Sequence, residues 1–363
     1  MTSSTLFDPL AVGEITAPNR VIMAPLTRNR SSGPGRVPNE LMREYYVQRA
    51  SAGFIITEAT SVSPAGVGYP HTPGIWSREQ TEGWRHIVDG VHEAGGRILL
   101  QLWHVGRVSD PSYHDGAAPP APSAIAAKGT VSLLRPKRPY PVPRALETSE
   151  IPGVVEAYRA AAENAQRAGF DGVEIHGANG YLLDQFLQDS TNKRTDAYGG
   201  PIENRARLML EVTDAVTSVW GPGRVGMHLA PRGDAHDMGD SDLAATFGYV
   251  ARELGKRKLA FIAAREGLES PRLGPDLKRA FGGVFIANQG FTKETAEAAI
   301  ASGEADAVAF GKLFISNPDL PARFRANAPL APWDDKTFYS DGRAGYTDYA
   351  RLGEAHGAVS FAP

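Results

Sequence analysis

Eight short apolar runs recur along this chain of 363 residues, and most of them are followed by a stretch of amphipathic, helical period. Each run is almost continuously hydrophobic, which is typical of parallel strands buried on both faces. The runs comprise residues 21–24, 54–57, 98–102, 172–175, 224–229, 259–263, 284–287 and 307–310. Eight strands alternating with helices predict a (β/α)8 TIM barrel. A doubly wound sheet is the alternative, but no GxGxxG motif opens any turn from strand to helix.

The segments outside the barrel strands are also informative. A hairpin is expected before the first strand, and helices are expected over residues 153–168 and 202–219, each with one apolar face. The stretch from about residue 104 to 149 contains eight prolines. Because barrel strands are needed on both sides of it, we interpret it as an excursion over the rim after strand 3, with a small hairpin near residues 129–134. A single barrel domain over residues 1–363 is the expectation.

The barrel fold predicts where function is located, because active sites of such barrels form at the carboxyl ends of the strands. Small or polar residues stand at or just beyond these ends in one run after another. They are Thr27, Glu58, Ala59, Gln101, His176, His228, Asn288 and Gly311. A random scatter of polar residues would not follow strand after strand, so the pattern predicts one composite site.

Composition excludes several classes of protein. The absence of cysteine excludes disulfides, cysteine-ligated iron–sulfur clusters and a thiol nucleophile. A formal net charge of −3 gives no support for a nucleic-acid partner or an anionic membrane partner. No secretory signal and no apolar run long enough to span a membrane is evident. A cytoplasmic protein without a metal site is expected.

The segment Glu174-Ile175-His176-Gly177-Ala178-Asn179-Gly180-Tyr181 joins a strand to a polar turn. His176 and Asn179 are hydrogen-bond donors, and donors that converge on a carbonyl oxygen favour reactions that build negative charge there. The phenol of Tyr181 could then give a proton to the adjacent carbon. The alternative is structural: His176 caps the strand, residues 179–180 form a turn and Tyr181 packs in the core.

The seventh and eighth strands end in turns suited to a phosphate group. Backbone N–H groups of two adjacent turns, together with a lysine, can hold a phosphate dianion, and barrels often bind phosphate after these strands. The residues concerned are Asn288, Gln289 and Gly290 in one turn and Gly311 and Lys312 in the other. Taken alone, each turn could equally be a strand end followed by a helix cap.

Five motifs in a fixed order resemble the Old Yellow Enzyme family of FMN-dependent ene-reductases, especially its classical branch and the bacterial xenobiotic reductases. The resemblance spans roughly residues 5 to 350. Its motifs are MAPLTR at 23–28, QLWHVGR at 101–107, HGANGY at 176–181, NKRTDAYGG at 192–200 and NPDL at 317–320.

The resemblance implies a tightly but non-covalently bound FMN. The turns after strands seven and eight would bind its phosphate, and positions matching Pro25, Thr27, Ala59 and Gln101 would contact its ring, with the Thr27 hydroxyl at the C4 carbonyl oxygen. Gln101 could instead satisfy backbone groups at the rim, and Thr27 could cap the segment that follows.

Two residues depart from the family pattern. His228 stands where the family usually carries an arginine near flavin N1 and O2, and a histidine supplies a positive charge there only when it is protonated. The alternative for His228 is that it turns towards neighbours such as Asp234 or Asp237. Lys312 replaces an arginine often found at the phosphate, which exchanges a bidentate donor for a point charge.

The implied reaction has two halves. NADPH or NADH reduces the flavin, and an α,β-unsaturated carbonyl compound is then reduced, with its oxygen at His176 and Asn179 and with Tyr181 as the proton donor. Tyr69, Trp103 and Tyr346 are expected to shape the substrate pocket, with core packing as the alternative for each. The partners would be small enone or nitro compounds, and the protein would be a monomer or homodimer.

Other functions remain open at this point. Nitro compounds or nitrate esters could occupy the same oxygen site, so nitroreduction is one alternative. An amine-oxidising or dienoyl-CoA-type flavoenzyme would need an iron–sulfur cluster, which the absence of cysteine disfavours. A flavin-free barrel lyase or isomerase, with His176 and Tyr181 as acid and base, is a third, and a flavin-binding protein without turnover is a fourth.

Overall fold

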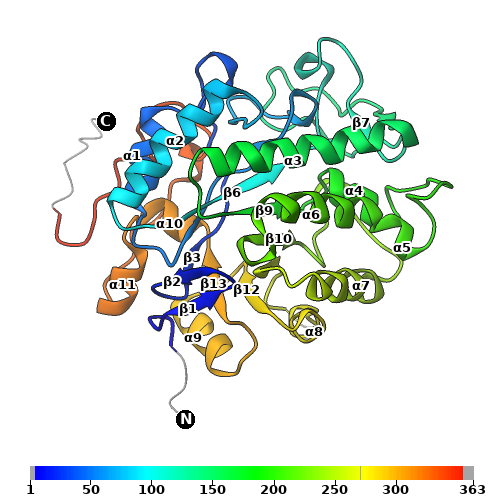
Figure 1. Ribbon diagram of the computed structural model, residues 1–363. Helices are drawn as coiled ribbons and strands as arrows, with labels where there is room; N and C mark the ends of the chain where they lie inside the picture. The colour runs from blue at the N-terminus through cyan, green and yellow to red at the C-terminus, as the bar shows by residue number, and fades with distance from the viewer. Residues whose placement is uncertain (1–4, 270, 355–363) are drawn as a thin grey trace.

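The computed structural model describes residues 5–269 and 271–354, and its core is a closed barrel of eight parallel strands (Figure 1). The strands are β3 (Val21–Met23), β4 (Ile55–Ile56), β6 (Ile98–Trp103), β9 (Gly172–His176), β10 (Val225–Leu229), β11 (Phe261–Arg265), β12 (Val284–Asn288) and β13 (Ala307–Phe310). Their order is β4-β3-β13-β12-β11-β10-β9-β6, and the pairing of β4 with β6 closes the ring. The predicted barrel is confirmed, and the doubly wound alternative is wrong. A short strand, β5 (Thr60–Ser61), adds to β6 at the rim.

Helices cover the outside of the barrel, as Figure 1 shows. They are α1 (Glu40–Gln48), α2 (Arg78–Glu93), α3 (Ile151–Arg167), α4 (Leu182–Leu187), α5 (Ile202–Arg205), α6 (Arg207–Trp220), α7 (Leu243–Lys256), α8 (Gly274–Phe281), α9 (Lys293–Ala301), α10 (Lys312–Ser316) and α11 (Leu320–Ala326). The helix expected over residues 153–168 is α3. The helix expected over residues 202–219 is divided into α5 and α6 at Ala206, which keeps helical backbone angles.

The lower part of the barrel interior is a dry apolar core. Inward-facing side chains such as Leu99, Phe261 and Ile286 fill it. Phe261 takes the space beside Gly226, where an added Cβ would lie 2.1 Å from its ring. The filled interior leaves only the carboxyl ends of the strands for a polar site.

The expected N-terminal hairpin is formed by β1 (Leu10–Val12) and β2 (Ile15–Ala17), which pair antiparallel. Val12, Ile15 and Ala17 join the interior core, so the hairpin covers the amino end of the barrel. Its turn fits closely, because the Glu14 N–H donates to the Gly223 carbonyl oxygen at 2.8 Å. Gly13 has a φ of +59°, and a Cβ there would lie 2.3 Å from that same oxygen.

The excursion between β6 and α3 covers one side of the rim, as predicted. It contains a short parallel pair, β7 (Pro120–Ala121) and β8 (Arg144–Ala145). The hairpin expected near residues 129–134 is reduced to a single antiparallel bridge between Thr130 and Pro139. Because proline has no N–H to donate, the prolines at 136, 139 and 141 prevent a longer ladder.

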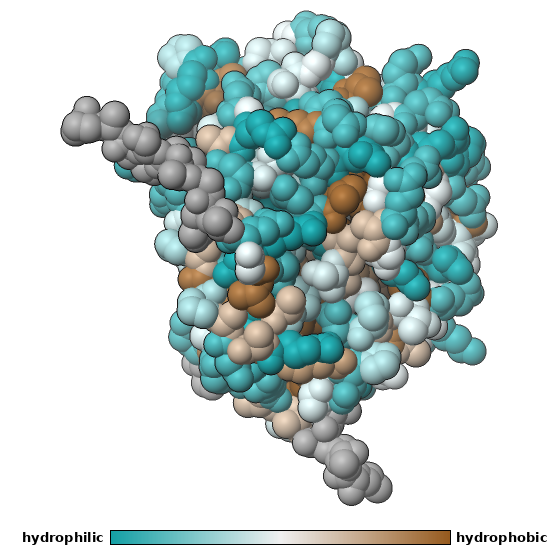
Figure 2. Space-filling view, turned by 90° about the vertical axis from the view of Figure 1, so that its left-hand side faces the viewer, coloured by the Kyte–Doolittle hydropathy of each residue, from teal (hydrophilic) through white to brown (hydrophobic). Residues whose placement is uncertain are grey.

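The surface is largely polar. On the face shown in Figure 2, hydrophilic residues predominate and hydrophobic residues form small, separate groups. Among the helices of the described residues, none combines the length and the apolar character that crossing a membrane requires.

A buried carboxyl group, Glu58, follows β4 and should make stability depend on pH. The Tyr46 hydroxyl donates to its Oε1 at 3.2 Å, and burial raises the pKa of Glu58 from 4.5 to about 7. Folding therefore favours the protonated form. The contribution of protonated Glu58 to the free energy of unfolding is fully present below pH 4.5 and is lost as the pH rises towards 7.

We expect the free energy of unfolding of Glu58→Gln, which cannot ionise, to increase relative to that of the unaltered protein when the pH is raised from 4.5 to 8. The gain should reach up to about 3 kcal/mol, because folding no longer opposes an ionised carboxylate. Urea unfolding of both proteins at the two pH values measures it. If the difference in unfolding free energy between the two proteins is the same at both pH values, the raised pKa of Glu58 is contradicted.

Candidate active site

A polar layer lies directly above the apolar core of the barrel. Gln101 of β6 is opposite Glu174 of β9 in the sheet register, and its Nε2 donates to Glu174 Oε2 at 2.7 Å. His228 of β10 is opposite His176, and its Nδ1 lies 3.5 Å from Glu174 Oε1. All four side chains are buried. Their alternation along the strands directs them inwards together.

Glu174 was not predicted as a site residue, although it belongs to the quoted motif and stands two positions before His176. That spacing places both side chains on the same face of β9 and could have identified it. The carboxylate neighbour of His228 is thus Glu174 and not Asp234 or Asp237. The Asp237 carboxylate instead pairs with Lys128 at 2.8 Å.

His176 is held as a neutral donor. Burial, followed by the charges of His228 and Arg265, lowers its pKa well below the usual range. Its Nδ1 accepts from the Ala178 N–H at 3.4 Å, so the ring proton is on Nε2. The imidazole can therefore donate a hydrogen bond without carrying a charge.

Asn179 is oriented by Arg265, a residue that sequence analysis did not single out. Asn179 has a φ of +57°, in the left-handed region, within the turn that follows β9. Arg265 Nη1 donates to Asn179 Oδ1 at 2.9 Å, and Arg265 Nε donates to Gln289 Oε1 at 3.0 Å. With its oxygen engaged, the Asn179 amide has its N–H groups free to donate. Arg265 itself is exposed.

Tyr181 lies among aromatic side chains at the N-terminus of α4. Its hydroxyl is 3.0 Å from that of Tyr69, and its ring stands edge-on to Trp103 and His176, with centroids 5.0 Å apart in each case. Burial raises the pKa of both phenols, so each keeps its proton near neutral pH. The structure thus brings together His176, Tyr181, Tyr69 and Trp103.

Tyr346 lies elsewhere. It is fully buried and stacks on Tyr45 at a centroid distance of 4.1 Å, with the guanidinium groups of Arg28 and Arg30 at 5.0 and 4.6 Å from its ring. These contacts are those of the core-packing alternative. The structure does not bring it to the Tyr181 cluster.

The residues predicted to hold the cofactor occupy adjoining strand ends. Pro25 and Thr27 are half-buried beyond β3, and Ala59 is buried beyond β4. Asn288 Nδ2 donates to the Ala309 carbonyl oxygen at 2.7 Å, which braces the ends of β12 and β13.

The two turns predicted to bind phosphate follow β12 and β13, and their backbone conformations differ. In the turn after β12, Gly290 has a φ of +82°. In the turn after β13, Gly311 precedes α10 and makes no side-chain cap. Lys312 is exposed, with its amine 5.5 Å from the centre of the Trp333 ring.

The polar layer fits a flavin ring in its chemistry. Three buried polar atoms there form no hydrogen bond among the described residues: Trp103 Nε1, and Glu174 Oε1 and His228 Nδ1, which lie 3.5 Å from each other. The pyrimidine edge of an isoalloxazine alternates carbonyl oxygens with an N–H group, so it can match such donors and acceptors. A buried orphan polar atom is costly unless a ligand or water satisfies it.

Comparison with known proteins agrees with this geometry. A family profile described as the NADH:flavin oxidoreductase / NADH oxidase family matches residues 5–331. The chain is 49% identical to morphinone reductase, solved in complex with tetrahydroNAD, with a TM-score of 0.93 over 98% of this chain and all of the other. It is 47% identical to the old yellow enzyme homologue from Zymomonas mobilis, with a TM-score of 0.93 over 96% and 99% of the two chains.

The chain belongs to the Old Yellow Enzyme family. It is an NAD(P)H-dependent flavin oxidoreductase. Among the family's plant members, 12-oxophytodienoate reductase 2 of Arabidopsis thaliana is 44% identical over 365 residues, which cover 96% of each chain.

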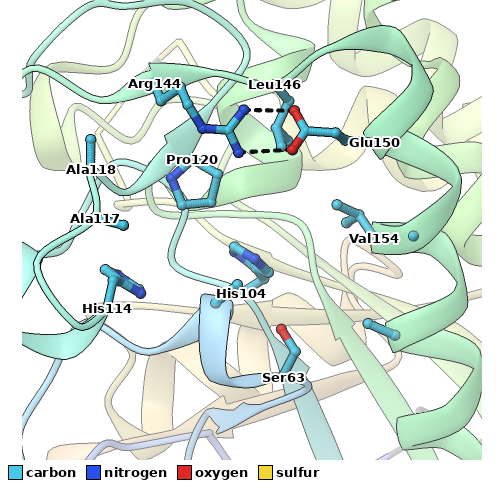
Figure 3. Close-up of a pocket in the computed structure, with 13 residues that line it drawn as sticks. Ser63, His104, His114, Ala117, Ala118, Pro120, Arg144, Leu146, Glu150 and Val154 are labelled. Atoms are coloured by element: carbon cyan, nitrogen blue, oxygen red, sulfur yellow. Dashed lines mark hydrogen bonds and ion pairs between the residues drawn. The ribbon is translucent and has the colours of Figure 1, made fainter.

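This Old Yellow Enzyme has a further cavity of about 370 Å³ between the excursion and α3 (Figure 3). It contains none of the predicted site residues, and two pairs of polar side chains there are bonded within the protein. Arg144 donates to both Glu150 carboxylate oxygens, at 2.6 and 2.9 Å, and His114 Nε2 is 2.8 Å from Ser109 Oγ. Burial lowers the pKa of His104 to about 3. The predicted site residues thus lie in the strand-end cluster and not in this cavity.

Proposed function

We propose that this protein is an FMN-dependent ene-reductase that uses NADPH or NADH to reduce the C=C bond of α,β-unsaturated carbonyl compounds. The observation that carries the proposal is a neutral imidazole donor and a protonated phenol with ring centroids 5.0 Å apart at the carboxyl end of the barrel, with an oriented amide in the turn between them. The relatives named 12-oxophytodienoate reductase and morphinone reductase favour oxo compounds as acceptors.

The cofactor would lie across the strand ends. Pro25, Thr27, Ala59, Gln101 and His228 would contact its ring, and the turns at residues 288–290 and 311–312 would hold its phosphate. When bound, FMN supplies the capacity to accept hydride from the nicotinamide and return it to the acceptor.

The protein's own contribution begins at the acceptor's carbonyl oxygen. His176 Nε2–H and the Asn179 amide would donate to this oxygen, where negative charge develops as the alkene is reduced. Donors fixed in a buried site stabilise such charge without having to reorganise. Arg265 keeps the Asn179 amide oriented and adds a positive charge nearby.

The second contribution is a proton. The Tyr181 hydroxyl would protonate the α-carbon, and its raised pKa ensures that the proton is present at neutral pH. Nitro compounds could use the same two oxygen donors. Assignment to the branch of bacterial xenobiotic reductases, a monomeric or homodimeric state, a single domain and a cytoplasmic location stay predictions.

The experiment that tests the proposal is anaerobic reduction of the purified protein with NADPH and with NADH, followed by reoxidation with enones, maleimides and nitro compounds. We expect a visible flavin spectrum that bleaches on reduction and returns with enones. Protein without flavin absorbance would favour the lyase or isomerase alternative. Flavin that is reoxidised by nitro compounds but not by enones would favour nitroreduction.

The oxygen-binding role of the two donors can be tested with phenols, which mimic the developing enolate oxygen. His176→Ala and Asn179→Ala should each weaken phenol binding about 10- to 100-fold, since a hydrogen bond to a charged oxygen is worth about 1.5–3 kcal/mol. Spectral titration of the oxidised holoenzyme measures the affinity. His104→Ala is the matched control, because this buried histidine lines the other cavity. If phenol affinity is unchanged in both donor variants, His176 and Asn179 do not bind the acceptor's oxygen.

A further inference from the structure

His236 is held beside the proton donor by an unusual backbone conformation. It lies in the loop after β10, in the 3-10 turn Ala235–Asp237, where His236 and Asp237 have φ values of +58° and +65°. Residues other than glycine adopt this left-handed region infrequently. The result is that the half-buried imidazole ring reaches 5.3 Å from the Tyr181 ring, measured between centroids.

A chain of polar atoms connects this imidazole to Tyr181. His236 Nδ1 lies 2.8 Å from the Asn179 main-chain oxygen, and His236 Nε2 lies 3.5 Å from the Tyr69 hydroxyl, the outer limit of a hydrogen bond. The Tyr69 hydroxyl is 3.0 Å from that of Tyr181. Such bonds are often long before substrate binds and shorten in the complex.

The first of these contacts fixes the tautomer of the ring. A main-chain carbonyl oxygen only accepts, so the proton of the neutral ring is on Nδ1. Nε2 then faces Tyr69 with a lone pair. When the ring is protonated, Nε2 carries a hydrogen and becomes the donor to Tyr69.

We propose that His236 and Tyr69 form a relay that returns a proton from water to Tyr181 after each turnover. The proposal rests on the proposed function, in which Tyr181 gives its proton to carbon. The resulting Tyr181 phenolate takes the Tyr69 hydroxyl proton, and Tyr69 takes the Nε2 proton of protonated His236. Nε2 of the imidazole is then protonated again by hydronium from the solvent, which leaves water, so one proton enters per turnover and no electron moves within the relay.

Access to water supports this direction of transfer. Tyr69 is only 8% exposed, and an acceptor bound over Tyr181 would separate that phenol from solvent. Tyr181 and His236 are both partly exposed, and with an acceptor in place over Tyr181 the imidazole of His236 would be the member that still reaches water. It is therefore a positioning residue that acts on the reacting carbon through two phenols.

The electrostatic surroundings of His236 determine how the relay responds to pH. The charged and titratable groups that face it are Arg107, Arg265, Tyr69, Tyr140, His176, Tyr181 and the Asp237–Lys128 pair. Burial lowers the pKa of His236, the two arginines add to this, and the bond to Asn179 opposes it. The protonated fraction thus falls as the pH rises through a value below the ordinary one, and proton supply should weaken in the same direction.

Comparison of single and multiple turnovers tests the relay, because the first turnover uses the proton already on Tyr181. In His236→Gln holoenzyme, flavin reduction by NADPH and a single reoxidation by an enone should stay near their original rates. In Tyr69→Phe, which also removes the hydroxyl partner of Tyr181, steady-state turnover should fall more than the rate of a single reoxidation. Steady-state turnover should fall about tenfold or more, as expected when an acid–base step is lost, and His236→Gln should lose the decline towards high pH. Tyr140→Phe, in the same cluster, is the control and should behave as the unaltered enzyme.

Chemical rescue separates proton transfer from a structural role. Added imidazole should restore steady-state turnover to His236→Ala, with more restoration at lower pH, and should leave Tyr69→Phe unrestored. If turnover and its pH profile are unchanged in both relay variants, or if imidazole rescues neither rate nor profile in His236→Ala, the relay is wrong. If Tyr181→Phe itself does not slow single reoxidation by an enone, the proposed role of Tyr181 fails instead.

Discussion

Replacing Tyr181 by phenylalanine should slow alkene reduction by about 10²- to 10⁴-fold, the usual loss when a general acid is removed. Reduction of the flavin by NADPH should be almost unaffected, because that half-reaction needs no proton at carbon. The ring would remain in its aromatic cluster, edge-on to Trp103 and His176. The variant therefore removes the hydroxyl and little else.

Stopped-flow measurement of each half-reaction decides this prediction. Reoxidation by a nitro compound should slow less than reoxidation by an enone, since nitro reduction does not require protonation of carbon. Tyr158→Phe is a suitable control because Tyr158 is a buried tyrosine of α3, outside the site. Equal slowing of both half-reactions in Tyr181→Phe would remove this residue from the role of proton donor.

The second large effect concerns stability. Arg49, at the end of α1, is fully buried, and its guanidinium donates to the main-chain oxygens of Phe314, Ile315 and Tyr346 at 2.9, 2.8 and 3.3 Å. It thereby joins α1 to α10 and to the C-terminal segment, and it lies 3.7 Å from the centre of the Tyr45 ring. Burial lowers its pKa to about 10, so it is still charged at neutral pH.

Arg49→Met should cost about 3–5 kcal/mol of unfolding free energy, because several buried carbonyl oxygens lose their donor at once. Urea unfolding at constant flavin concentration measures the loss. Arg43→Met on the same helix is the matched control, since Arg43 forms only partly exposed ion pairs with Glu40 and Glu93 and should change stability by about 1 kcal/mol or less. Similar losses in both variants would show that the buried hydrogen bonds of Arg49 are not the cause.

The barrel could be predicted from sequence because its signal is local. Each strand is a short apolar run, and period two along β9 directs Glu174 and His176 to the same side. The motif at 176–181 likewise keeps its donors within six residues. The hairpin expected near residues 129–134 is reduced to one bridge, because the neighbouring prolines limit pairing.

The missed residues act across long sequence separations. Arg265 contacts Asn179 from 86 positions away, and His236 does so from 57. Neither separation has a recognisable pattern in a single sequence, since both contacts depend on the parallel pairing of β9, β10 and β11. Tyr346 illustrates the reverse case, because a tyrosine in a polar tail gives no sign that it will be stacked in the core.

The N-terminal hairpin has a consequence for how substrates reach the active site. With Val12, Ile15 and Ala17 packed into its base, beneath an interior filled by core side chains, the barrel is closed at its amino end. A nicotinamide and an acceptor that both work at the strand ends cannot enter from opposite sides. If both react at the strand ends as proposed, they share that end of the barrel, and each is expected to inhibit the reaction of the other when it is present in excess.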